Sequence, residues 1–145
     1  MRKIISVLFV VLVFFNYSHS QSVVGKIYTK ADADNLYGPV ITSVPISASL
    51  LLSLTNNTKN YLMFRINNGN LIILDNQRIG LFPGNVSVNS NDEFRYFSVS
   101  LIQNIIVNGK AVFASVEIRN NNILTITNGN FTLEVSFPCP PVCPD

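Results

Sequence analysis

Histidine is nearly absent from this chain, whose single histidine, His19, lies at the end of an apolar leader. Once that leader is removed, no imidazole remains for Ser-His-Asp or Cys-His catalysis. The same absence excludes zinc and copper sites that depend on histidine ligands. We therefore predict no catalytic residue, no metal site and no cofactor.

Charged residues are scarce as well: they make up 12% of the 145 residues, whereas 48% are apolar. This composition is typical of a folded domain with a buried core and excludes a disordered chain. Two of the ten basic residues lie in the leader, so eight basic residues remain against eight acidic ones. A neutral chain without a basic cluster lacks the charges that neutralise phosphates, so we expect no nucleic-acid partner.

Residues 1–20 are predicted to be a secretory signal peptide. Two basic residues precede an apolar run from Ile4 to Phe15. This run is shorter than the roughly 20 residues that a helix needs to cross a bilayer. The small side chains that follow predict cleavage between Ser20 and Gln21, and an uncleaved signal anchor is the alternative. We expect a secreted or periplasmic protein with no stable membrane span after cleavage.

The rest of the chain carries a weak internal repeat. The segment Ile46–Leu51 is similar to Phe97–Ile102, and later Ile, Asn and Leu positions match at nearly the same offset. The candidate repeats cover residues 40–83 and 92–137. Chance similarity between two stretches rich in Asn and Ile is the alternative.

Each half is predicted to contain a helix followed by a three-stranded meander. Apolar residues from Leu101 to Ile106 share one helical face, and Ser100 with Gln103 has the spacing of a capping box. The corresponding helix of the first half is expected after Ser49. A further short helix is predicted between Thr29 and Tyr37, with Thr29 as its cap.

Hairpin signals divide the meanders into strands, and Asn68-Gly69 is the strongest of these signals. In the last segment, apolar residues from Phe131 to Phe137 alternate with polar ones, which predicts one buried face and one solvent face. The expected strands are 40–44, 61–67, 70–75, 94–99, 112–119, 122–127 and 130–137.

These elements predict a single α+β domain at residues 21–137. We expect an antiparallel sheet of about six to eight strands with two or three short helices, arranged as a tandem helix-plus-meander duplication. An all-β sandwich is the alternative, in which the Ser-x-Ser segments are also strands.

The carboxylates show no pattern that marks an active site. Glu117 and Glu134 are predicted to be ordinary surface charges on the solvent faces of strands. Asp32 and Asp34 are spaced as calcium ligands, but the other ligands of a calcium-binding loop are missing, and a helix start explains both residues.

Tyr61 and Arg65 are expected on the outer face of their strand. In that position they are candidates for part of a binding surface. The alternative is an ordinary solvent-facing strand of mixed polarity.

Residues 138–145 form a proline-rich tail that contains both cysteines, Cys139 and Cys143. An oxidising compartment favours a disulfide between them. An extended polyproline conformation would hold their Cα atoms about 12 Å apart, so a disulfide requires the chain to turn. A soft metal bound by the two thiolates, or bonds to another chain, are the alternatives.

Together these features predict a small exported binding or interaction module that is not an enzyme. Its expected partner is another protein or a surface ligand. One alternative is a hydrolase that uses carboxylates, and another is a thiol-based metal or redox protein that acts through the tail.

Overall fold

The computed structural model describes residues 22–140 and 142–143. The predicted antiparallel α+β class is confirmed, because the described chain forms two antiparallel sheets of five strands each and three α-helices. The predicted signal peptide and its cleavage site between Ser20 and Gln21 lie outside the described residues.

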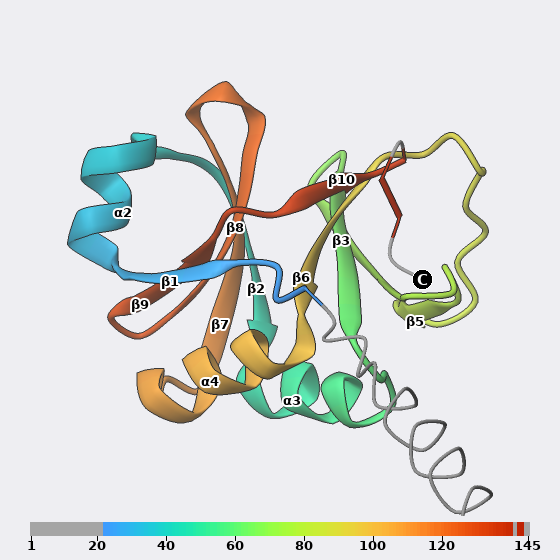
Figure 1. The fold of residues 1–145 in the computed structure, drawn as a ribbon, viewed down its shortest axis with the longest axis horizontal. Helices are drawn as coiled ribbons and strands as arrows, with labels where there is room; N and C mark the ends of the chain where they lie inside the picture. The colour runs from blue at the N-terminus through green and yellow to red at the C-terminus, as the bar shows by residue number, and fades with distance from the viewer. Residues whose placement is uncertain (1–21, 141, 144–145) are drawn as a thin grey trace, which may run out of the picture.

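The two sheets lie side by side in Figure 1, with the first sheet on the left and the second on the right. The first sheet has the order β1 (Lys26–Thr29), β9 (Phe131–Glu134), β8 (Ile123–Asn128), β7 (Phe113–Arg119) and β2 (Val40–Ser47). The second sheet has the order β10 (Phe137–Cys139), β6 (Phe94–Ser98), β3 (Tyr61–Asn67), β4 (Asn70–Asp75) and β5 (Gly80–Phe82). The predicted strands at 61–67 and 70–75 therefore have the observed bounds.

The order of a strand, a helix and three strands occurs twice along the chain. The first occurrence runs from β2 through α3 (Ala48–Asn56) to β5, and the second runs from β6 through α4 (Val99–Gly109) to β9. β2 pairs with β7 of the second half, and β6 pairs with β3 of the first half. Each half thus supplies one strand to the other half's sheet. A duplication of the chain stays a prediction.

The main hydrophobic core lies between the two sheets, and α3 and α4 close its lower end in Figure 1. Both sheets and both helices contribute side chains with no exposed surface, among them Leu51, Phe64, Ile73, Ile102, Val116 and Ile126. A smaller apolar cluster covers the other face of the second sheet and includes Met63, Leu74, Phe94, Tyr96 and Cys139. β4 therefore packs on both faces, as its uninterrupted apolar run predicts.

The helix caps agree only partly with the sequence pattern. The cap of α2 (Lys30–Tyr37) is confirmed, because Thr29 Oγ1 accepts a hydrogen bond from Asp32 N at 3.2 Å and donates one to Asp32 Oδ2 at 2.6 Å. α3 begins earlier than expected, since Ser47 Oγ and not Ser49 caps it through Leu50 N at 3.4 Å. Within the described residues, no helix is long and apolar enough to span a membrane.

The predicted capping box of α4 is wrong. The helix begins after Ser98, whose hydroxyl instead accepts a hydrogen bond from Val24 N at 2.7 Å. Gln103 does not return to the helix start, because its side-chain amide donates to Thr55 Oγ1 on α3 at 3.1 Å. Ser98 and Gln103 therefore bond to residues distant in the chain and do not cap the helix.

The predicted strand at 130–137 is wrong in its second half. β9 ends at Glu134, because Val135 has a φ of +64°, and the chain then crosses to the second sheet as β10. The predicted solvent face is also wrong there, because Glu134 has no exposed surface, as Leu133 on the opposite face has none. The cause is α2, which covers the outer face of the first sheet. Phe137, expected to be buried, lies in the second sheet and is 47% exposed.

Candidate functional site

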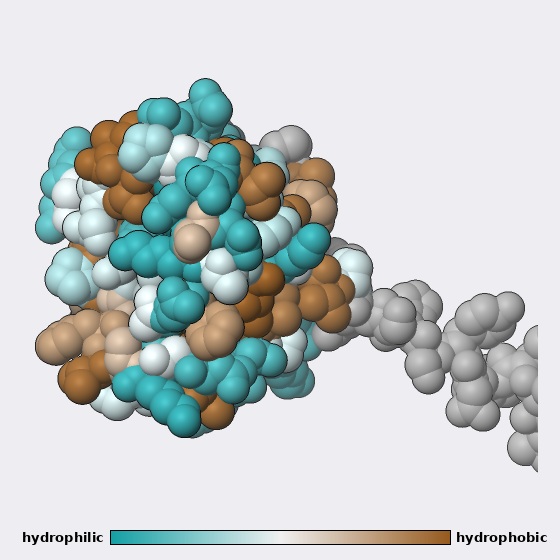
Figure 2. All heavy atoms as spheres, turned by 90° about the vertical axis from the view of Figure 1, so that its left-hand side faces the viewer, coloured by the Kyte–Doolittle hydropathy of each residue, from teal (hydrophilic) through white to brown (hydrophobic). Residues whose placement is uncertain are grey.

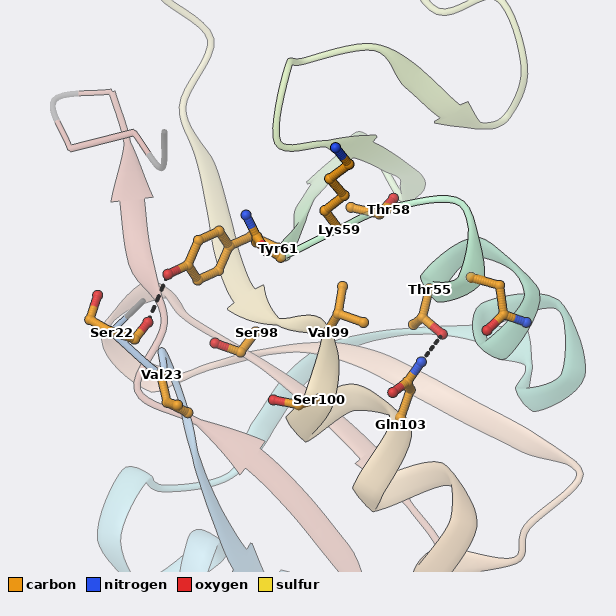
Figure 3. A pocket seen from close by; sticks show the side chains of 12 residues that line it. Ser22, Val23, Thr55, Thr58, Lys59, Tyr61, Ser98, Val99, Ser100 and Gln103 are labelled. Atoms are coloured by element: carbon orange, nitrogen blue, oxygen red, sulfur yellow. Dashed lines mark hydrogen bonds between the residues drawn. The ribbon is translucent and has the colours of Figure 1, made fainter. Parts of the chain in front are cut away.

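A pocket of about 520 Å³ lies where the C-terminal end of α3, the start of α4 and the segment before β1 meet (Figure 3). Tertiary structure brings these three segments together, because the start of α4 bonds to Asn60 and Val24. Most of its wall is polar, and the polar members include Ser22, Asn56, Lys59, Asn60, Ser100 and Gln103.

Hydrogen bonds hold the wall of this pocket in place. Tyr61 Oη donates to the carbonyl oxygen of Ser22 at 2.7 Å, and the Gln103 amide donates to Thr55 Oγ1 (Figure 3). These bonds give the pocket a defined wall.

Tyr61 and Arg65 were expected on the exposed outer face of their strand. Tyr61 is instead only 6% exposed and packs edge-on against Tyr96. Arg65 forms an ion pair with Asp92 at 2.7 Å.

The electrostatics of the pocket are simple. Lys59 is its one charged wall residue among those described, and no Asp or Glu lines it. The first turn of α4 also lies here without a side-chain cap, and its positive dipole end adds partial positive charge, although the Val99 amide already donates to the Asn60 carbonyl oxygen. The wall therefore offers hydrogen-bonding groups and one ammonium, which suits a polar ligand that is neutral or negatively charged.

A second feature is a group of charges between α2 and the first sheet, which we name the Arg119 cluster: the buried Arg119, Glu117 and Glu134, and the exposed Asp34. The Arg119 guanidinium has no exposed surface. It forms ion pairs with Asp34 at 2.7 Å, with Glu134 at 3.1 Å and with Glu117 at 3.6 Å. It also donates to the carbonyl oxygen of Gly38 at 2.8 Å, so it fixes the C-terminal end of α2 to the sheet.

The two glutamates of the Arg119 cluster differ in their surroundings. Glu117 accepts hydrogen bonds from Thr127 at 2.9 Å and Thr125 at 3.3 Å. Neither oxygen of Glu134 has a hydrogen-bond partner among the described residues. Burial raises the pKa of Glu134 to about 7, although Arg119 acts to lower it, while Glu117 and Asp34 raise it further.

The expectation that Glu117 and Glu134 are surface charges is therefore wrong, since both are buried. A strand that alternates apolar and polar residues looks the same whether its polar face meets water or a covering helix. The run of Thr125, Thr127 and Thr132 opposite these acids is the signal that could have indicated a buried polar face.

The structure gives the aspartates of the calcium hypothesis other roles. Asp32 bonds to Thr29 at the start of α2, and Asp34 pairs with Arg119. Within residues 22–140 and 142–143, no group of three or more acidic, histidine or cysteine side chains could hold a metal ion.

The tail cysteines form a disulfide with each other, with their Cα atoms 4.6 Å apart. The Cys139–Pro140 peptide bond is cis. Cys139 has no exposed surface, and Arg78 donates to its sulfur at 3.4 Å. The sequence suggested the pairing but not the arginine, which is distant in the chain.

Comparison of the chain with protein-family models, with curated proteins and with solved structures found no match.

Proposed function

We propose that this protein is a small exported binding module that holds a polar ligand in the pocket between α3, α4 and the segment before β1. The main support for ligand binding is the size and polarity of the pocket. Its volume of about 520 Å³ is in the usual range of small-molecule sites. Its wall is mostly polar, so an apolar ligand would leave hydrogen-bonding groups without partners.

The charge of the wall indicates which ligands the pocket can bind. Lys59 can pair with an acidic group, while Asn56, Ser100 and Gln103 can bind hydroxyl or carbonyl groups. A cationic ligand would meet no carboxylate there. The proposed ligand is therefore a small hydroxylated or acidic molecule.

Binding without turnover is supported by the chemistry of the same wall. Its polar side chains are hydroxyls, amides and one lysine, and the described wall holds no carboxylate or histidine that could serve as a general base. Export is supported by the disulfide, since disulfides persist in oxidising compartments. Intact mass of the exported protein tests this part, because a chain beginning at Gln21 is expected.

One observation favours a carboxylate-dependent hydrolase as a second candidate. Glu134 has a pKa of about 7 and lies beside Glu117, and a group that titrates near neutral pH suits general acid catalysis. Substrate could reach this pair only if α2 moved away from the sheet, because both side chains are buried beneath it.

Thermal denaturation with defined probes tests the proposal. We expect citrate, inorganic phosphate, glucose or N-acetylglucosamine to raise Tm, because a ligand that binds only the folded state stabilises it. Lys59→Gln should remove the response to the acidic probes. Lys110→Gln is the matched control, since Lys110 follows α4 as Lys59 follows α3 but lies outside this pocket. No response to any probe at millimolar concentration would contradict the proposal.

A further inference from the structure

We propose that the disulfide between Cys139 and Cys143 is a site of thiol–disulfide exchange, at which an external thiolate attacks the sulfur of Cys143 and Arg78 holds the departing thiolate of Cys139. The incoming group is a small thiol such as glutathione or the dithiol of a reductase. This site is separate from the pocket and does not depend on its ligand.

The disulfide contributes little to the stability of the fold. Only three residues separate the two cysteines, so opening the ring releases very little chain entropy. β10, which ends at Cys139, is held independently by its pairing with β6. The bond can therefore open and close while the rest of the domain stays folded.

The two cysteine residues differ in their exposure. Cys139 belongs to the apolar cluster on the second sheet and has no exposed surface, whereas Cys143 is exposed. A thiolate attacks a disulfide in line with the S–S bond, so attack on Cys139 would require approach past the residues that bury it. Attack on Cys143 comes from the solvent side. The geometry therefore selects Cys143 as the attacked sulfur and Cys139 as the leaving group.

Arg78 is positioned to stabilise that leaving group. Its guanidinium donates to the carbonyl oxygens of Asn89 at 3.1 Å and Asp92 at 2.9 Å, which fix its orientation. It also donates to Cys139 Sγ at 3.4 Å. A hydrogen bond to a neutral disulfide sulfur is weak, but it strengthens as negative charge develops on that sulfur. The donor is thus in place before the charge appears.

The exchange is balanced in atoms and electrons. The incoming sulfur forms a bond to Cys143 Sγ, and the S–S bond breaks so that its electron pair leaves with Cys139 as a thiolate. The second thiol of a dithiol reductant, or a second glutathione, then attacks the incoming sulfur of the mixed disulfide as a thiolate and releases Cys143 as a thiolate. The two attacking thiols lose their protons to solvent, and the two cysteine thiolates take up protons from it. The protein disulfide is reduced by two electrons, and the reductant is oxidised to its own disulfide.

Mass spectrometry of the full chain locates the attacked sulfur. The oxidised protein is treated briefly with glutathione, quenched with acid, alkylated and fragmented. We expect glutathione on Cys143 and the alkyl group on Cys139. Glutathione on Cys139, on both cysteines equally, or on neither would overturn the proposal.

Reduction kinetics with dithiothreitol, which carries no charge other than that of its reacting thiolate, test the role of Arg78. We expect Arg78→Gln to slow reduction by about tenfold, the effect of roughly one charge-assisted hydrogen bond, and Arg78→Lys to restore part of the rate. Arg65→Gln is the matched control, because Arg65 contacts Phe94 and Asp92 as Arg78 does but makes no hydrogen bond to either cysteine within the described chain. An unchanged or faster rate in Arg78→Gln, or equal slowing in both glutamine variants, would contradict this role.

Discussion

Replacing Glu134 by glutamine should stabilise the protein at alkaline pH and leave it unchanged at mildly acidic pH. The pKa of Glu134 is raised from 4.5 to about 7, so the folded state holds this proton more tightly than the unfolded state does. As pH rises from about 4.5 to about 7, the unfolded state loses the proton first, and the free energy of unfolding falls. The difference corresponds to about 3 kcal/mol, fully lost above pH 7.

An amide has nearly the shape of a protonated carboxyl group but cannot ionise. Glu134→Gln should therefore nearly match the wild type near pH 5 and exceed it near pH 8 by up to about 3 kcal/mol, a difference that already includes the attraction between Glu134 and Arg119. Urea denaturation at both pH values measures the two free energies. Glu93→Gln is the control, because its exposed ion pair with Arg95 should contribute at most about 1 kcal/mol at either pH.

Equal destabilisation of Glu134→Gln at both pH values would contradict the claim that ionisation of Glu134 destabilises the folded state. It would mean that the ionised carboxylate of Glu134 stabilises the Arg119 cluster despite its burial. A wild-type curve whose dependence between pH 5 and pH 8 is unaltered by the substitution would refute it equally.

Three further changes probe other parts of the fold by urea denaturation. Glu117→Gln should destabilise the protein at neutral pH by about 1–3 kcal/mol, because it weakens two buried hydrogen bonds from threonines, and equal stability would argue against them. Reducing the disulfide between Cys139 and Cys143 should cost at most about 2 kcal/mol, since the ring is small; a larger loss would mean that the disulfide supports the core. Gly129→Ala should cost well over about 1 kcal/mol, because its φ is +58° and a Cβ would clash with the end of α4, whereas Gly69→Ala, at φ +78° in open space, should cost less.

Local patterns in the sequence predicted elements wherever neighbouring residues decide the structure. The Asn68-Gly69 turn set the register of β3 and β4, in which Asn67 pairs with Asn70 on either side of the turn. Thr29 likewise capped α2 through a contact three residues away. Both features follow from residues that are adjacent or nearly adjacent in the chain.

Features that depend on distant contacts were not predictable from local patterns. α4 begins at Val99, so Ser100 is not its cap, and Gln103 bonds to Thr55 on α3; the Ser98 hydroxyl at the cap position bonds to Val24. Val135 adopts a left-handed backbone where the chain leaves one sheet for the other, a position that β-branched residues rarely occupy. Alternation of polar and apolar residues indicated neither feature.

In the candidate sites too, features set by nearby residues were predicted, and features set by distant contacts were not. Pairing of Cys139 with Cys143 was predicted, because the two residues are close in the chain and the predicted export favours a disulfide. The pocket around Lys59 was not, because three segments far apart in the sequence form its wall. The surface over α2 mixes hydrophilic and hydrophobic residues, and nothing in this mixture indicates the buried charges beneath it (Figure 2).

Mapping of amide chemical shifts in the ¹⁵N-labelled protein shows whether a ligand binds at the pocket. Titration with citrate, inorganic phosphate, glucose and N-acetylglucosamine should move the amide signals of Lys59, Ser100 and Gln103 in a saturable way for at least one probe. Signals from β5 and from the tail should stay in place, because they lie outside the pocket. Saturable shifts confined to another surface, or no shifts with any probe, would contradict ligand binding at the pocket.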